Sequence, residues 1–394
     1  MHADARPQGD REGEDAALAR LVLAGGRAAA RRALLDSVGS AAEALRAGTD
    51  AWRAAGLDAR QCQALRQGDP AREDAIARWL RQPGCHAIGW HHPDYPPLLR
   101  AAPSPPVALF VHGEPAALWH PAIAVVGSRA ATTAGRDLAF EFARAFARTG
   151  LAVASGLASG IDAAAHLGAL DAAHGPTVAI LGCGPDIAYP RANAGLMARI
   201  AASGGAVASE HPPGTAPQSA FFPSRNRIIA GLSLGTLVVE AHARSGALIT
   251  ARQAAEAGRE VFALPGSVRN PAARGCHRLI RDGALLVETP GEVLDALAPL
   301  VLREAGRLRE TLPAEIGLDT MEPAPDAAIG AHGAAAPALP PDHHRLWQAL
   351  GHDPIPMDAL VERTGLTAAE LSSILLVMEL DGRVSAQHGR YARR

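Results

Sequence analysis

The chain has 394 residues, 48% of them apolar, and its 38 basic and 40 acidic side chains give a formal net charge of −2. This length is sufficient for two or three domains with at least one large core, and the balanced charge argues against a wholly basic nucleic-acid binder. Neither an apolar run of about 18 residues nor a secretory signal is recognisable, so we expect a cytoplasmic protein with no membrane association.

The N-terminal part of the chain predicts a small helical module. Residues 1–15 are polar and of mixed charge, and we expect them to be disordered. Residues 16–90 have the pattern of short Ala/Leu/Arg helices that are interrupted at glycines. A proline-rich segment at 94–106 then leads into a predicted strand at 107–113, so the next domain is expected to begin near residue 94.

Strands and helices alternate regularly from Ala122 onward. Short apolar strands are each followed by an alanine-rich helix that ends on glycine, which indicates a parallel sheet covered on both faces. The predicted fold class is therefore α/β, with an extended Rossmann-like, doubly wound, mainly parallel sheet over residues 94–300. The predicted strands are 123–128, 151–157, 177–184, 206–211, 235–241, 260–266 and 284–289.

The C-terminal region predicts a linker followed by a second domain. Residues 303–341 are rich in Pro, Ala and Gly and offer no apolar face, which is typical of a flexible linker. Residues 342–394 have the order helix, helix, glycine turn, helix and hairpin of a winged helix-turn-helix domain. Its third helix carries Glu370, Glu379 and Asp381 but no base, so we expect it to contribute little to DNA affinity.

Glycine and serine follow the first two parallel strands, where ligands bind in doubly wound sheets. Glycine allows an anion to approach the backbone, the hydroxyl groups add hydrogen bonds and an arginine adds a charge-assisted pair. The alternative is that these glycines only form tight turns between strand and helix. The candidate anion-binding residues are Gly127, Ser128, Arg129, Ser155, Gly156 and Gly160.

A concentrated basic segment follows the fourth strand. Every basic residue of the chain is an arginine, and Ser219 to Arg281 contains nine of them against three glutamates, a local charge of +6. The stretches "YPRAN" and "FFPSRNR" should lie at the same sheet edge as Arg129, with a helix starting near Asn226. Arginines beside aromatic rings suit a single nucleic-acid strand, although Phe222 could equally pack in the core. The additional candidates are Arg191, Asn193, Phe222, Arg225, Asn226 and Arg227.

Catalytic and cofactor patterns are weak. "GCGPDI" and "GSRAAT" both fail the dinucleotide fingerprint, and no GxSxG, HExxH or Walker A string occurs. The four cysteines have no metal-ligand spacing, so we expect reduced structural thiols with no metal and no cofactor. Asp162 and His166 could share a helix face but have no third partner. The remaining enzymatic alternative is a nucleotide-processing hydrolase of the phosphoribohydrolase type, with Glu240 in "GLSLGTLVVEA" as its glutamate.

The ordered motifs over residues 94–290 resemble the bacterial DNA-processing protein A family (DprA, also called Smf). They include "VGSRAAT", "SGLASGIDAAAH", "TVAILGCGPDIAYPRAN" and "FPSRNRIIAGLS". The resemblance implies a non-catalytic protein that binds and protects incoming single-stranded DNA during natural transformation and loads RecA recombinase onto it. It also implies DNA contacts at Arg129 and Arg191, and a homodimer formed around Leu279, Ile280 and Leu285.

Overall fold

The computed structural model describes residues 8–172, 175–311, 341–351, 355–367, 371, 374–375, 378, 384–387 and 390–393. The chain divides into two units, Met1–Glu310 and Thr311–Arg394. In the described part, no helix is long and apolar enough to span a membrane.

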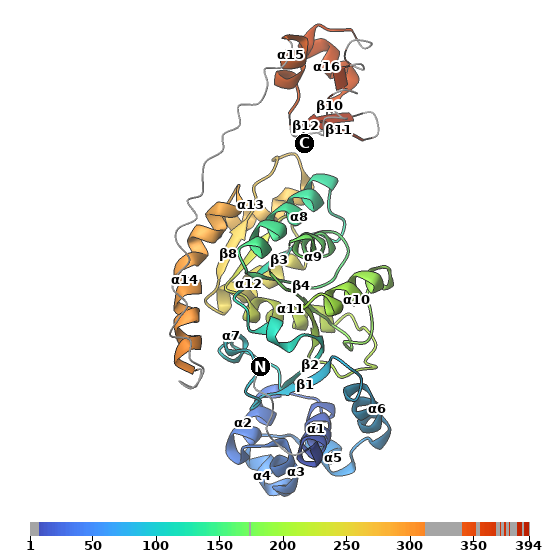
Figure 1. The fold of residues 1–394 in the computed structure, drawn as a ribbon, viewed down its shortest axis with the longest axis vertical. Coiled ribbons are helices and arrows are strands. Elements are labelled where there is room, and N and C mark those ends of the chain that lie inside the picture. The colour runs from blue at the N-terminus through green and yellow to red at the C-terminus, as the bar shows by residue number, and fades with distance from the viewer. Residues whose placement is uncertain are drawn as a thin grey trace. The chain divides into compact units, whose positions relative to one another are not determined.

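A nine-stranded sheet forms the centre of the first unit, in the order β1-β2-β6-β5-β4-β3-β7-β8-β9 (Figure 1). Every pairing from β6 to β9 is parallel, whereas β1 with β2 and β2 with β6 are antiparallel. The predicted α/β class with a mainly parallel sheet is therefore confirmed. The strands are β1 Cys85–Gly89, β2 Ala108–Gly113, β3 Ala122–Val126, β4 Ala152–Ser155, β5 Thr177–Ile180, β6 Ala206–Ser209, β7 Gly235–Val238, β8 Glu260–Ala263 and β9 Leu285–Leu286.

Helices cover both faces of this sheet, as the nearly continuous apolar strands predict (Figure 1). Successive side chains of a strand point to opposite faces, so Ile123 and Val125 join one core while Ala124 and Val126 join the other. The first face is covered by α8 Thr133–Arg148, α9 Ile161–Asp171, α10 Ala194–Ala202 and α14 Pro290–Thr311; the second is covered by α7 Pro97–Arg100, α11 Phe221–Leu232, α12 Ala247–Glu256 and α13 Arg274–Arg281. Short 3-10 turns are η1 Pro115–Leu118, η2 Arg191–Asn193 and η3 Pro271–Ala273.

The N-terminal module consists of six short helices. They are α1 Gln8–Leu23, α2 Ala28–Val38, α3 Ala41–Arg46, α4 Gly48–Ala54, α5 Ala59–Gln67 and α6 Pro70–Leu80. Because α1 begins at Gln8, the disorder predicted for residues 1–15 is wrong from Gln8 onward, and residues 1–7 lie outside the described part. The predicted module also extended too far, since residues 85–89 form β1 of the large sheet.

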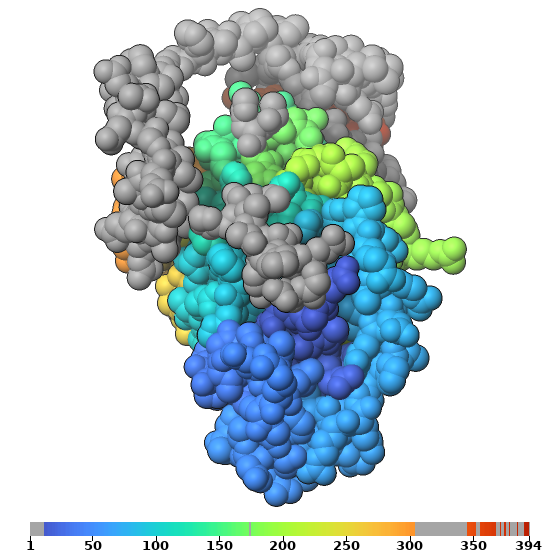
Figure 2. Space-filling model, turned by 60° about the horizontal axis from the view of Figure 1, so that its bottom comes forward, coloured from blue at the N-terminus to red at the C-terminus, as the bar shows by residue number. Residues whose placement is uncertain are grey.

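This helical module is joined to the sheet by shared apolar contacts. Val107 and Ala108 belong to the core of the module, and the ring of Trp79 meets that of Phe110 on β2 at 6.4 Å. Trp90, directly after β1, contacts the guanidinium groups of Arg32 and Arg100. Figure 2 shows the blue module forming one surface with the following cyan segment. The module is therefore part of the first unit and not a separate domain.

The C-terminal unit has its own small core. It contains α15 Pro341–Ala349, β10 Ile355–Pro356, α16 Met357–Thr364, β11 Val384–Gln387 and β12 Arg390–Arg393. Leu346, Leu360, Leu375 and Val384 pack together at its centre. Because α14 continues to Thr311, the linker predicted from residue 303 begins too early; residues 312–340 lie outside the described part, as do Glu370, Glu379 and Asp381 of the predicted third helix.

The crossing of α8 and α9 provides a test of this packing. A Cβ atom at Gly168 of α9 would lie 2.2 Å from the backbone oxygen of Phe140 on α8. An exposed helical Gly→Ala change is normally stabilising by about 1 kcal/mol. We expect Gly168→Ala instead to destabilise the protein by about 1–3 kcal/mol in urea unfolding, because the two helices must separate.

Gly195→Ala on α10 is the matched control, because a Cβ there would meet nothing within 4 Å. Its unfolding midpoint should stay the same or rise. Equal midpoints for Gly168→Ala and the unchanged protein would contradict the close crossing.

Candidate nucleic-acid interface

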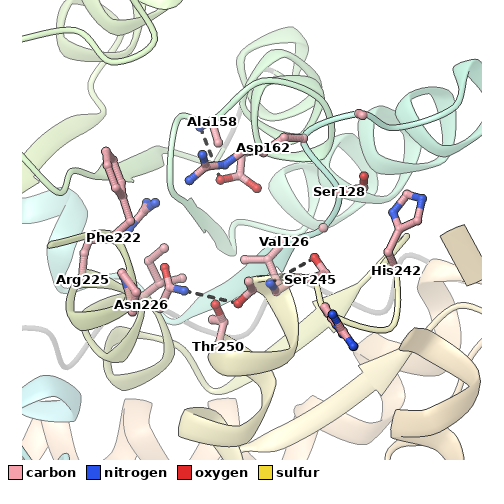
Figure 3. Close-up of a pocket in the computed structure, with 18 of the residues that line it drawn as sticks. Val126, Ser128, Ala158, Asp162, Phe222, Arg225, Asn226, His242, Ser245 and Thr250 are labelled. Carbon is pink, nitrogen blue, oxygen red and sulfur yellow. Dashed lines mark hydrogen bonds between the residues drawn. The ribbon is translucent and has the colours of Figure 1, made fainter. Parts of the chain in front are cut away.

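A pocket of about 690 Å³ lies at the carboxyl ends of the parallel strands (Figure 3). In a doubly wound sheet this edge is where ligands bind, because the chain reverses there and helix N-termini face the opening. Figure 3 shows Phe222, Arg225 and Asn226 projecting from α11 on one side of the pocket and His242 and Ser245 on the other. Of the predicted residues, the pocket is lined by Gly127, Ser128, Arg129, Phe222, Arg225 and Asn226.

The loops at the bottom of the pocket come so close together that two glycines have no room for a side chain. A Cβ at Gly127 would lie 2.5 Å from the Ile161 side chain, and one at Gly160 would lie 2.3 Å from the Ser128 oxygen. Gly160 also has a φ of 82°, which favours glycine. Tight turn geometry thus accounts for both residues, and it also brings the loop after β3 against the start of α9.

Arg225 lies in the interior and not at the surface where the sequence predicted a cation. Only 4% of the residue is exposed, and its Nη1 donates a 2.6 Å hydrogen bond to the Ile180 carbonyl at the end of β5. A Cβ at Gly156 would lie 1.8 Å from the same Nη1, so Gly156 makes room for the guanidinium. Burial lowers the pKa of Arg225, and the charge of Asp162 opposes this shift. Arg225 therefore ties α11 to the ends of β4 and β5.

Asp162 and His166 share α9 but do not converge on one site. A carboxylate oxygen of Asp162 accepts hydrogen bonds from the Gly156 and Ala158 backbone at 3.2 and 3.4 Å. Burial raises the pKa of Asp162, and Arg225 is the largest opposing influence. The Nδ1 of His166 lies 2.8 Å from the Thr177 hydroxyl, and burial lowers the pKa of this imidazole to about 3. His166 is thus held inside the fold, whereas Asp162, although mostly buried, is among the residues that line the pocket.

Other predicted polar residues also brace the backbone. The Ser155 hydroxyl donates to the Val125 carbonyl at 2.7 Å, and the Asn193 amide donates to the Leu157 carbonyl at 2.8 Å. Half-buried Arg227 forms an ion pair with Glu210, so its charge is already partnered. The helix predicted to start near Asn226 begins at Phe221, because Arg225 in its second turn is bonded to the end of β5.

Two of the predicted arginines, Arg129 and Arg191, are exposed. The guanidinium of Arg129 lies 5.4 Å from the centre of the Phe222 ring. Within the described part of the chain, neither arginine forms an ion pair with a carboxylate. Arg191 lies outside the pocket, two residues after Tyr189, which lines it. These two cations are therefore available to an anionic ligand.

Sequence reasoning missed most of the residues that line the pocket, and three of them carry aromatic or basic side chains. Tyr189, His242 and Arg244 line it but were not predicted. The signal for Tyr189 was present, because an aromatic residue stands beside an arginine in "YPRAN" just as it does in "FFPSRNR". Arg244 belongs to the basic segment, yet its place at the opening depends on the loop between β7 and α12.

The residues predicted for a dimer interface differ in exposure. Leu279 and Ile280 are partly buried and pack against the core of the second face. Leu285 and its neighbour Leu286 are 47% and 49% exposed on β9, the last strand of the sheet. An apolar edge strand offers unpaired backbone groups and side chains to a partner.

Glu240, the glutamate of the enzymatic alternative, is held by hydrogen bonds within the fold. Its two carboxylate oxygens accept hydrogen bonds from the Thr132 backbone at 2.9 Å and from the Thr132 hydroxyl at 2.6 Å. A Cβ at Gly135 would lie 2.4 Å from the carboxyl carbon. Glu240 thus holds Thr132, the residue whose side chain caps α8, at the start of the helix, where a negative charge is favourable.

A sequence model of the DNA recombination-mediator protein A family matches residues 86–298. This chain belongs to that family. A second model, the DprA winged helix domain, matches residues 330–390, in agreement with the predicted winged-helix fold of the C-terminal domain.

Individual relatives agree with this assignment. Protein Smf of Escherichia coli is 40% identical over 338 residues, which cover 86% of this chain and 85% of that protein. DNA processing protein DprA of Streptococcus pneumoniae is 46% identical over 189 residues, or 48% of this chain and 66% of the relative. The crystal structure of the Streptococcus pneumoniae protein has a TM-score of 0.63 at 35% identity, covering 71% of this chain and 97% of that one.

The hydrogen bonds of Glu240 to Thr132 lead to a stability prediction. Glu240→Ala leaves the Thr132 amide and hydroxyl without their acceptor, so we expect a loss of about 1–3 kcal/mol in urea unfolding. The matched control is Glu256→Ala on α12, whose exposed carboxylate pairs with Arg252 and should change stability by less than about 0.5 kcal/mol. A Glu240→Ala protein as stable as the control would refute this role of Glu240.

Proposed function

We propose that this protein binds single-stranded DNA at the pocket and along its rim, without catalysing a reaction on it. The observation that carries the proposal is the pair of exposed arginines beside the aromatic contact between Phe222 and Tyr189. Arg129 lies 5.4 Å from the Phe222 ring, and Arg191 follows Tyr189 by two residues in the chain. Guanidinium groups pair with phosphates, and aromatic rings accept unstacked bases. Family membership supports a role in DNA processing.

A single strand suits this site better than a duplex. Unpaired bases can leave the backbone and enter a pocket, whereas bases in a duplex are stacked and paired. The volume of about 690 Å³ exceeds the needs of one phosphate group and is within the usual range for small organic ligands. The Ser128 backbone N–H already donates to the Glu240 carbonyl at 2.7 Å, so this loop would meet the strand through Arg129.

Each predicted residue has a distinct part in this proposal. Arg129 and Arg191 contact phosphates directly, and Asn226 lies at the lining of the pocket. Arg225 and Arg227 act indirectly, because one is buried against β5 and the other is paired with Glu210. Four further candidates shape the loops and are not proposed as DNA contacts; they are Ser155, Gly156, Gly160 and Asn193.

A catalytic role finds little support among the acidic residues of the pocket region. Glu240 is engaged by Thr132 through both oxygens, and Asp162 is buried between backbone amides. A general base must reach the proton that it removes. We therefore include the absence of catalysis in the proposal.

The proposed partners follow from family membership. We infer a cytoplasmic homodimer that forms through the β9 edge, where Leu285 is exposed, and that delivers single-stranded DNA to RecA recombinase during transformation. Exposed apolar side chains on an edge strand support the dimer.

The phosphate contacts can be tested by charge removal. We expect Arg129→Ala and Arg191→Ala each to weaken binding of labelled single-stranded oligonucleotides by about tenfold, or 1.4 kcal/mol, whatever their sequence. The slope of log affinity against log salt should fall by about 0.7 for each phosphate that the variant no longer neutralises. Fluorescence anisotropy at several salt concentrations measures both quantities.

Arg252→Ala is the matched control, since this exposed arginine of α12 lies outside the pocket. Its affinity and salt slope should equal those of the unchanged protein. If both test variants also behave like this control, the proposed binding of single-stranded DNA at the pocket and its rim is wrong.

The C-terminal domain should contribute little to this binding. The acidic third helix predicted from the sequence would repel phosphates, so deletion of residues 342–394 should change single-strand affinity by less than about tenfold. Anisotropy titration of the shortened and full-length proteins, with matched unfolding curves, provides the comparison. A larger loss would show that the winged-helix domain binds DNA.

A further inference from the structure

We propose that Tyr189 is the side chain on which a base of the bound strand stacks. This proposal rests on the single-strand binding proposed above and adds a base contact to the phosphate contacts of Arg129 and Arg191. It assigns a role to a residue that sequence reasoning left out.

The argument begins with the surroundings of Phe222, the aromatic residue that the sequence suggested for stacking. The Tyr189 ring lies 5.1 Å from the Phe222 ring at an angle of 32°, and the guanidinium of Arg129 lies 5.4 Å from its centre. Because Tyr189 and Arg129 already contact the Phe222 ring, less of that ring is open to a base. Tyr189 itself remains 43% exposed, so it is the outer ring of this cluster.

Other aromatic side chains near the same sheet edge are already engaged. The ring of Phe221 stacks on the imidazole of His211 at 4.0 Å and 29°. The indole of Trp90 contacts two guanidinium groups and the Tyr95 ring, and its Nε1 donates to Asp36 at 2.7 Å. Among the Phe, Tyr and Trp side chains that the structure describes at the pocket, Tyr189 is therefore the most exposed.

The segment that carries Tyr189 is held in place before any ligand binds. Ile187 donates its backbone N–H to Gly184 and accepts the Cys183 thiol at 3.2 Å. On the other side of Tyr189, the Asn193 amide bonds to Leu157 at 2.8 Å. A ring held on a braced loop loses little conformational entropy when a base stacks on it.

The position of Tyr189 also suits a nucleotide. Arg191 follows two residues later and is exposed. One strand could therefore stack a base on the Tyr189 ring and place a neighbouring phosphate against the Arg191 guanidinium. Stacking is tolerant of sequence because every base has a flat π surface. The contact therefore adds affinity that depends on the presence of bases but not on their order.

This distinction gives the experiment. Tyr189→Leu and Tyr189→Phe are titrated with a labelled thymidine oligonucleotide and with an abasic oligomer that has the same number of phosphates. Tyr189→Leu should bind the thymidine oligomer about tenfold more weakly, with an unchanged salt slope, and should bind the abasic oligomer as the unchanged protein does. Tyr189→Phe should bind both oligomers normally.

Two controls separate this proposal from the one on which it rests. Arg191→Ala should lose affinity for both oligomers, because it removes a phosphate contact. Leu167→Ala, a 37% exposed apolar residue of α9 outside the pocket, should leave both affinities unchanged. If the arginine variants weaken binding and Tyr189→Leu does not, the stacking role of Tyr189 is refuted, while DNA binding at the pocket and its rim is supported. If the arginine variants have no effect, the proposed DNA binding at the pocket and its rim is refuted.

A measurement on the unchanged protein covers the case in which Tyr189→Leu fails to fold. Oligonucleotides containing 5-iododeoxyuridine form photo-crosslinks to aromatic side chains that stack on the base. Mass spectrometry should find the crosslink on the peptide that contains Tyr189. A crosslink confined to another aromatic residue would overturn the proposal.

Discussion

The geometry of the pocket depends on the buried guanidinium of Arg225. This group bonds to the Ile180 carbonyl at the end of β5 and fills the space left by Gly156. A buried guanidinium must find acceptors, so the start of α11 is held against the strand ends. Phe222 stands one turn earlier on the same helix and is thereby placed beside Arg129 and Tyr189.

The arginines of this region therefore have separate roles. Arg225 uses its hydrogen-bonding capacity inside the fold, and Arg227 is paired with Glu210. Arg129 and Arg191 are exposed and form no ion pair within the described part of the chain, so a phosphate would not have to displace a carboxylate from them. Arg129 and Arg191 lie outside the basic segment 219–281, whereas Arg225 and Arg227 belong to it and are engaged within the fold. The local charge of +6 therefore overstates the charge that a ligand would meet.

The helical module lies at the same edge of the sheet as the pocket. Both β1 and β6 are antiparallel to β2, so they point the same way, and Trp90 leaves the sheet at the edge where Glu210 follows β6. The module packs on Val107 and Ala108, at the beginning of β2. It is thereby integrated with the domain that carries the site.

Apolar periodicity and glycine turns act locally, so the sequence was sufficient to predict the alternation of strands and helices, the parallel character of the sheet and the edge at which the candidate residues gather. It did not predict that β1 joins the sheet, since its pairing with β2 depends on contacts between distant segments. Only the folded chain shows that Arg225 is buried, that Arg227 is paired with Glu210 and that Tyr189 is exposed. The arginines of "FFPSRNR" cannot be distinguished in the sequence. The packing of α11 determines which of them is buried and which reaches a carboxylate.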